Sequence, residues 1–229
     1  MTQTAIIVAH GSPSDPEPQE QALQALANKV ESLLDDWQVR GATLAAPGRF
    51  DAALDAFDSP LIYPFFMAQG YFTGRILAPK SKARGLTQLP PFGVEPGLPD
   101  CAETYLRQTL TRNGWWVEDT ALLMAAHGSK VSRTSADSTL AMEQELAHRL
   151  AFRRTLSGFI EEPPFVKDQA QGLGQAICLN FLALGAGHTL GDVPEALAEA
   201  GFDGVVLPPM IDWPDVPALI ADSLRRAVG

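Results

Sequence analysis

Cysteine is scarce in this sequence, and the two that occur, Cys101 and Cys178, lie in different halves of the chain. Neither belongs to a Cys-x-x-Cys or a Cys/His spacing, so the sequence predicts neither a disulfide framework nor a structural zinc site. We expect both thiols to be buried as small apolar side chains.

The sequence also has few basic residues and no long apolar run. Lys and Arg number 17 against 27 Asp and Glu, which gives a formal net charge of −10. This balance excludes nucleic acid as the expected partner, because phosphate binding needs a basic face. No apolar run approaches the roughly 20 residues of a membrane span, and the N-terminal segment has neither a basic region nor a cleavage signature. We therefore expect a cytoplasmic globular protein, without membrane contact, that acts on a small molecule or metal ion.

What the chain does contain is an internal repeat. The segment TAIIVAHGSP (4–13) reappears as ALLMAAHGSK (121–130), which places His10 opposite His127. Further matches follow in the same order and at nearly constant spacing: 40–44 with 157–161, 61–73 with 177–189, and 89–100 with 207–218. A collinear set of this kind indicates tandem duplication. We place the repeats at residues 1–117 and 118–229.

Each repeat reads as alternating strands and helices. Residues 4–9 and 121–126 are short apolar runs followed by His-Gly-Ser, the pattern of a buried parallel strand that ends in a loop. Amphipathic helices are expected afterwards, with apolar faces Leu23, Leu26, Val30 and Leu33 in the first repeat and Leu140, Met142, Leu146 and Leu150 in the second. The expected fold class is α/β: two tandem copies of a small three-layer α/β/α lobe with a parallel sheet, of the flavodoxin-like kind.

Three candidate ligands follow successive strands of the second repeat. They are His127, then Glu161 in GFIEEPP (158–164), then His188 in GAGHTLGDVP (185–194). Ligands of such sheets collect beyond the carboxyl ends of the strands. Two neutral imidazoles and a carboxylate suit Co²⁺, Fe²⁺ or Ni²⁺ and leave coordination positions open for transfer. The neighbouring Glu162 is a rival to Glu161, since either carboxylate could be merely solvated.

The paired His-Gly-Ser openings, GFIEEPP and GHTLGDVP resemble the sirohydrochlorin chelatases of cobalamin and siroheme biosynthesis, in their long two-lobe form. The resemblance covers essentially the whole chain and implies a chelatase-like fold. It also implies a lyase that inserts Co²⁺ or Fe²⁺, or Ni²⁺, into sirohydrochlorin or a related tetrapyrrole. Metal binding and catalysis would fall on His127, Glu161 and His188, with no organic cofactor and the divalent metal as a substrate.

The first repeat departs from this pattern. It keeps His10 but has Leu44 opposite Glu161 and Phe72 opposite His188. We therefore predict a degenerate N-terminal lobe, with Phe65, Phe66, Tyr71 and Phe72 beside the ring, and a working site in the C-terminal lobe. Basic residues that flank the motifs are candidates for holding the ring's carboxylates: Lys130, Arg133, Arg153, Arg154 and Lys167.

A second function remains open at this point, a non-catalytic protein that binds metal or tetrapyrrole for a partner in the manner of a metallochaperone. The sequence also leaves open the physiological metal, the particular tetrapyrrole, a role for His10, and the choice between a monomer and a homodimer. A histidine phosphatase is disfavoured, because its site needs an Arg before the His and this chain has Ala9 and Ala126 there.

Overall fold

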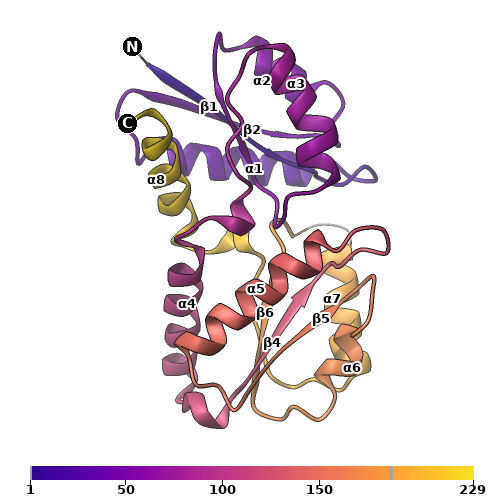
Figure 1. Cartoon of the computed structure of the whole chain (residues 1–229). Coiled ribbons are helices and arrows are strands. Elements are labelled where there is room, and N and C mark those ends of the chain that lie inside the picture. The colour runs from indigo at the N-terminus through magenta and orange to yellow at the C-terminus, as the bar shows by residue number, and fades with distance from the viewer. Residues whose placement is uncertain (1, 186–187) are drawn as a thin grey trace. The chain divides into compact units, whose positions relative to one another are not determined.

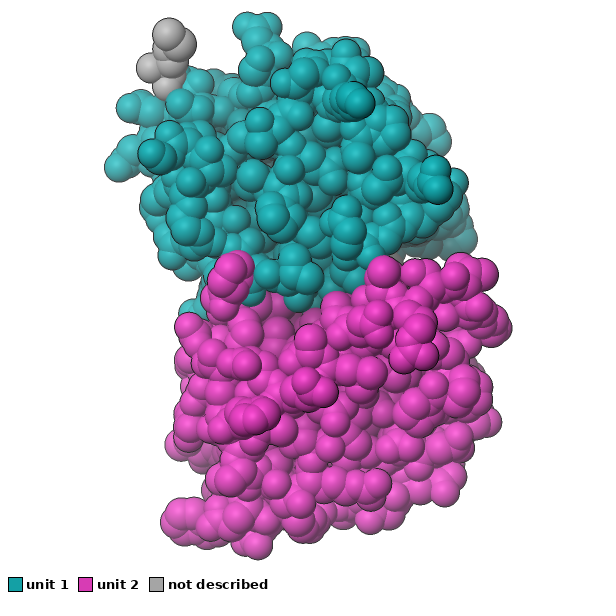
Figure 2. Space-filling view, viewed as in Figure 1, with its two compact units in different colours: residues 1–95, 183–186, 211–229 teal, residues 96–182, 187–210 magenta. Residues whose placement is uncertain are grey.

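The computed structural model describes residues 2–185 and 188–229, with the side chains of 188–190 also outside the description. The chain divides into two compact units (Figure 2). Unit 1 comprises Met1–Glu95, Ala183–Ala186 and Ile211–Gly229, and unit 2 comprises Pro96–Leu182 and Gly187–Met210. Among the described residues, none of the helices is both long enough and apolar enough to cross a membrane.

Unit 1 is built on a parallel sheet in the order β2-β1-β3. Strands β1 and β2 of this sheet are labelled in Figure 1. Because residues 5–9 of β1 are at most 1% exposed, both faces of this sheet are covered. Ile6 and Val8 pack with Phe50 on one face, while Gly41 on the other lies against the Leu23 backbone. The elements are β1 (Gln3–Ala9), α1 (Glu17–Glu31), β2 (Trp37–Thr43), α2 (Arg49–Asp55), β3 (Leu61–Pro64), the π-helix η1 (Phe72–Leu77), α3 (Ala78–Ala83), the 3-10 turn η2 (Phe92–Val94) and α8 (Val216–Val228).

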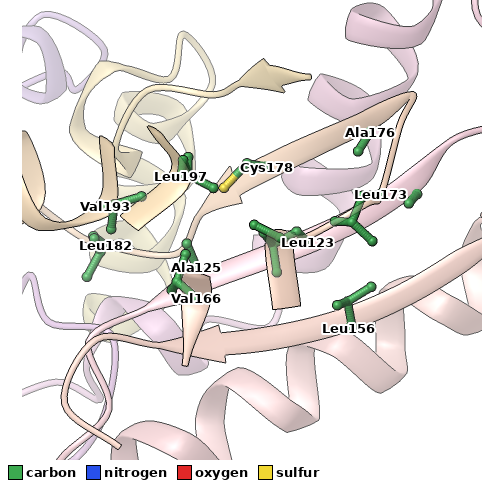
Figure 3. Close-up of a cluster of buried hydrophobic side chains, with 12 residues drawn as sticks. Leu123, Ala125, Leu156, Val166, Leu173, Ala176, Cys178, Leu182, Val193 and Leu197 are labelled. Atoms are coloured by element: carbon green, nitrogen blue, oxygen red, sulfur yellow. The ribbon is translucent and has the colours of Figure 1, made fainter. Parts of the chain in front are cut away.

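Unit 2 repeats this plan with one more strand, in the order β5-β4-β6-β7, again all parallel. Leu123 and Ala125 of β4 pack with Val166, Val193 and Leu197 on one face (Figure 3). The elements are α4 (Leu98–Asn113), η3 (Val117–Asp119), β4 (Ala121–Ala126), α5 (Thr134–Arg149), β5 (Arg154–Phe159), α6 (Val166–Ala170), β6 (Ala176–Asn180), α7 (His188–Glu199) and β7 (Val205–Val206); the short 3-10 turn η4 (Met210–Asp212) crosses into unit 1. The predicted fold class, two α/β lobes with parallel sheets, is confirmed.

The compact units exchange the last helix of each sequence repeat. Helix α4 closes the first repeat but belongs to unit 2, where Arg149 of α5 pairs with Asp100 and Glu103. Helix α8 closes the second repeat but belongs to unit 1, where it contacts α1. The boundary at 117/118 thus stays a prediction about where the two sequence repeats meet. The compact units defined by tertiary contacts have different limits.

Two details of the predicted helices are corrected. Leu33 is 45% exposed, because α1 ends at Glu31 and the apolar face does not continue through Leu33. Leu140 is 37% exposed, because α5 buries Met142 and Leu146 but turns Leu140 toward solvent. The cysteine prediction is confirmed, since Cys101 and Cys178 are both buried and neither forms a disulfide.

A buried carboxylate holds α8 in unit 1. Glu95, only 5% exposed, accepts hydrogen bonds from the hydroxyls of Tyr63 (3.3 Å) and Ser223 (3.0 Å) and pairs with Arg226. Burial, and then the charge of Glu95, raise the pKa of Tyr63 well above its usual value.

The raised pKa of Tyr63 predicts a loss of stability at alkaline pH. The unfolded chain ionises this phenol near pH 10, whereas the folded chain keeps it protonated, so the free energy of unfolding falls above pH 10 by about 1.4 kcal/mol per pH unit. Urea unfolding from pH 8 to 11 should show a shallower fall in Tyr63→Phe. Tyr71→Phe, at a residue that is 66% exposed, is the control and should keep the wild-type slope. Burial raises the pKa of Cys178 to about 12, and this thiol adds the same pH dependence of the free energy of unfolding in all three proteins.

Candidate metal centre

Two of the predicted ligands follow adjacent strands of unit 2. His127 comes directly after β4, and Glu161 comes two residues after the end of β5. Beyond the strand ends the backbones stay paired, because the Glu161 N–H donates to the His127 carbonyl at 2.9 Å and the Ile160 N–H donates to the Ala126 carbonyl at 3.0 Å. The two ligand-bearing backbones are therefore directly bonded at the carboxyl edge of the sheet.

A backbone carbonyl beside the His127 ring favours one of its two tautomers. Gly128 adopts a left-handed conformation with φ +70°, and its carbonyl oxygen lies 3.0 Å from His127 Nδ1. A carbonyl can only accept, so this contact is a hydrogen bond when Nδ1 carries the proton, the tautomer that leaves the ligating lone pair on Nε2. A neutral imidazole of this kind is the form that binds a divalent metal.

The two neighbouring glutamates have different surroundings. Glu161 Oε2 lies 3.1 Å from Lys130 Nζ, in an ion pair whose side chains are 32% and 75% exposed. Glu162 Oε1 instead accepts the Ser129 N–H at 2.8 Å and lies against the Gly128 turn. Glu161 thus pairs with a lysine, while Glu162 is bound to the loop that follows His127. Sequence reasoning found no signal for this link, since it joins residues that are distant in the chain.

The third predicted ligand is only partly described. His188 is the first residue of α7, so it begins a helix and does not lie inside a loop. Its side chain lies outside the described residues. Among the side chains that the structure describes, no group of three His, Cys, Asp or Glu comes together as a metal site. The triad of His127, Glu161 and His188 therefore stays a prediction.

The first repeat shows where the equivalents of the two histidines lie. His10 follows β1 as His127 follows β4, and Phe72 begins η1 as His188 begins α7. The His10 and Phe72 rings pack with centroids 4.1 Å apart, and Phe66 and Tyr71 stand around Phe72. Burial lowers the pKa of His10, against a smaller opposing effect from its backbone hydrogen bond to Gly11. In unit 1 an aromatic cluster thus occupies the place of the predicted metal ligands.

The register of the strands corrects one equivalence. The Leu44 N–H donates to the Ala9 carbonyl and the Ala45 N–H to the His10 carbonyl. The corresponding donors in unit 2 are Ile160 and Glu161, so the residue opposite Glu161 is Ala45 and not Leu44. Sequence matching missed this shift, because backbone hydrogen bonds and not side-chain similarity define the register.

The basic residues near the motifs are largely engaged within unit 2. Arg153 and Arg154 stand at the amino end of β5, the opposite end from Glu161, and the Arg153 guanidinium donates to the Leu173 carbonyl. The others form ion pairs, Lys130 with Glu161, Arg133 with Asp137 and Lys167 with Glu199.

A groove of about 360 Å³ opens beside Ile160 between α6 and α7, and the sequence did not predict it. The charged residues that line it are Lys167, Asp192, Glu195 and Glu199.

Gly128 predicts a measurable steric cost at this site. A Cβ at Gly128 would lie 2.9 Å from Phe159 Cβ and 3.0 Å from Glu162 Cγ, in addition to the left-handed strain of φ +70°. Gly172 has φ +64° but nothing within 4 Å, so Gly172→Ala measures the strain alone, about 1–2 kcal/mol. Urea unfolding should show Gly128→Ala destabilised by roughly 1–3 kcal/mol more than this control. Equal losses would mean that the turn relaxes without disturbing Glu162.

Comparison with known proteins places the chain in a family. No protein-family model and no curated protein sequence matches it. A solved structure of CbiX, described as the terminal enzyme for biosynthesis of siroheme in denitrifying bacteria, is 44% identical, with a TM-score of 0.90, over 99% of this chain and 100% of that one.

Two more distant structures share the fold. DR2241 from Deinococcus radiodurans, a multi-domain protein with structural similarity to chelatases, is 19% identical over 97% of this chain and 54% of its own, with a TM-score of 0.73. SirB from Bacillus subtilis with Fe³⁺ is 13% identical over 99% and 95%, with the same TM-score. On the strength of the CbiX match over the full length, the chain belongs to the CbiX family of sirohydrochlorin chelatases.

Proposed function

We propose that this chelatase inserts Co²⁺ or Fe²⁺, with Ni²⁺ as a third candidate, into sirohydrochlorin or a closely related tetrapyrrole. The observation that carries the proposal is the direct backbone bond between Glu161 and His127 at the carboxyl edge of the second sheet. The relative that makes siroheme in denitrifying bacteria supports the same assignment, since it matches this chain from end to end.

The working site lies in unit 2 and uses His127, Glu161 and His188 as metal ligands. The contact of His10 with Phe72 supports this set, because the repeat relates these residues to His127 and His188. An imidazole pair with one carboxylate holds a first-row divalent ion while leaving positions for the ring nitrogens.

Insertion requires the metal to shed water and the ring to lose two N–H protons. The balanced reaction converts the free ring and M²⁺ into the metallated ring and two H⁺. Neutral His127 binds the ion through Nε2, and the same lone pair can accept a proton once the ion has left. Glu161 lowers the charge of the ion in transit and supplies a second proton acceptor.

Lys130 links the metal to the anionic ring. Its ammonium lies 3.1 Å from Glu161, and it competes with a cation for that carboxylate. A divalent ion on Glu161 displaces Lys130, whose charge then becomes available to a carboxylate of the tetrapyrrole. This exchange matters because the protein carries a net charge of −10 and must hold a polyanionic ring locally.

The first repeat takes no direct part in metal transfer. Ala45 and Phe72 stand where Glu161 and His188 would be required, which leaves His10 as a single ligand against an aromatic ring. One imidazole packed against an aromatic ring does not hold a divalent ion against water. We assign unit 1 a supporting role in the fold.

An anaerobic assay tests the function. Purified protein is mixed with sirohydrochlorin and Co²⁺, Fe²⁺ or Ni²⁺ in turn, and the absorbance change of metallation is compared with the rate without protein. We expect acceleration with at least one metal. Binding of the ring or metal by calorimetry, with no acceleration by any metal, would overturn the proposal and favour the non-catalytic binding protein.

A further inference from the structure

We infer that Glu162 is a positioning residue, which holds the His127 imidazole in the tautomer that presents Nε2 to the metal. The inference rests on the proposed function for its consequence, but its structural part concerns the metal-free protein alone. Glu162 does not bind the ion itself; it acts through the turn that connects it to His127.

The connection is a short chain of contacts. Glu162 Oε1 accepts the Ser129 N–H at 2.8 Å, and the Glu162 side chain packs so closely on Gly128 that a Cβ there would lie 3.0 Å from Glu162 Cγ. The hydrogen bond holds the Gly128–Ser129 peptide, whose carbonyl lies 3.0 Å from His127 Nδ1. The carboxylate therefore sets the direction of the carbonyl that selects the tautomer.

The same segment is also tied to His127 from the other side. The Glu161 N–H and the Ile160 N–H both donate to the His127 carbonyl, at 2.9 and 3.2 Å. Residues 160–162 and 127–129 thus form one hydrogen-bonded unit, in which the Glu162 carboxylate adds a side-chain bond to the backbone bonds between the two segments. Groups that orient a ligating imidazole commonly change metal affinity by 10–100-fold when removed.

Unit 1 lacks this carboxylate, although His10 makes the same kind of backbone hydrogen bond to the glycine that follows it, Gly11. Ala46 stands opposite Glu162 in the corrected register, and its N–H is directed to the Thr43 hydroxyl. The His10 ring also packs against Phe72, a contact that has no described counterpart at His127. Phe72 can hold the His10 ring in place, because His10 need not bind an ion. In unit 2 the residue equivalent to Phe72 is the proposed ligand His188, so the orientation of His127 has to come from its own loop.

The test uses the full-length chain and three variants: Glu162→Ala, Glu162→Gln and Glu118→Ala. Long-range ¹H–¹⁵N correlation of the imidazoles reports the His127 tautomer without metal, with the signal assigned through a His127 variant. Calorimetry with Co²⁺ alone reports affinity. Glu118 is an exposed carboxylate of unit 2 that lies before β4, so Glu118→Ala removes the same charge away from the turn.

We expect wild-type His127 to carry its proton on Nδ1 and Glu162→Ala to give a mixture of tautomers with 10–100-fold weaker Co²⁺ binding. Glu162→Gln retains an oxygen acceptor for Ser129 and should stay within a few-fold of wild type, as should Glu118→Ala. A wild-type His127 protonated on Nε2 would overturn the inference without any variant. Unchanged tautomer and affinity in Glu162→Ala would also overturn it. If Glu162→Ala changes the tautomer but the wild-type protein metallates no tetrapyrrole, the proposed function is wrong and the positioning role of Glu162 is still supported.

Discussion

Replacing His127 with alanine should abolish metal insertion, with a loss of at least about 100-fold in kcat/KM. The imidazole is assigned both to ligation and to proton acceptance, and general acid–base catalysis alone contributes about 10²–10⁴-fold. His188→Ala should have an effect of the same size, because neither remaining pair of ligands holds the ion in place. The measurement is the anaerobic insertion assay with the metal that gives the fastest wild-type rate.

Two controls accompany this prediction. His148→Ala removes an exposed imidazole from α5 and should leave activity unchanged. His10→Ala should leave most of it, because His10 packs against Phe72 and has Ala45 where a carboxylate would be needed. The opposite ranking, with His10→Ala inactive and His127→Ala active, would move the working site to unit 1.

The second large effect is expected on stability. Glu95→Ala should lower the free energy of unfolding by roughly 2–5 kcal/mol, because it leaves the hydroxyls of Tyr63 and Ser223 without their buried acceptor, at about 1–3 kcal/mol each. It also removes the partner of Arg226. Urea unfolding followed by circular dichroism measures the loss. We expect α8 to become sensitive to protease first, since Glu95 bonds two of its residues.

Asp222→Ala is the matched control for Glu95. Asp222 also pairs with an arginine of α8, Arg225 at 2.6 Å, but both side chains are more than half exposed. Exposed pairs contribute about 0–1 kcal/mol. If the two variants lose equal stability, the burial of Glu95 has no special role in holding α8 on unit 1.

Much of the fold could be predicted from local patterns. The apolar runs before His10 and His127 are buried parallel strands, and the repeat correctly indicated two α/β lobes. These features follow from the residues themselves, because a strand buried on both faces needs a continuous apolar run. The positions of His127 and Glu161 after adjacent strands could be predicted for the same reason.

Other features depend on contacts between residues far apart in the sequence. Periodicity identifies α4 and α8 as helices, but only packing decides that α4 contacts α5 and α8 contacts α1. Side-chain similarity aligned Leu44 with Glu161, while the hydrogen bonds of the strands align Ala45 with it. The different roles of Glu161 and Glu162 likewise arise from tertiary contacts, with Lys130 and with Ser129. Residue types and their spacing determined the kind of chemistry, because these are local properties; the orientation of each group was decided by partners brought close only by folding.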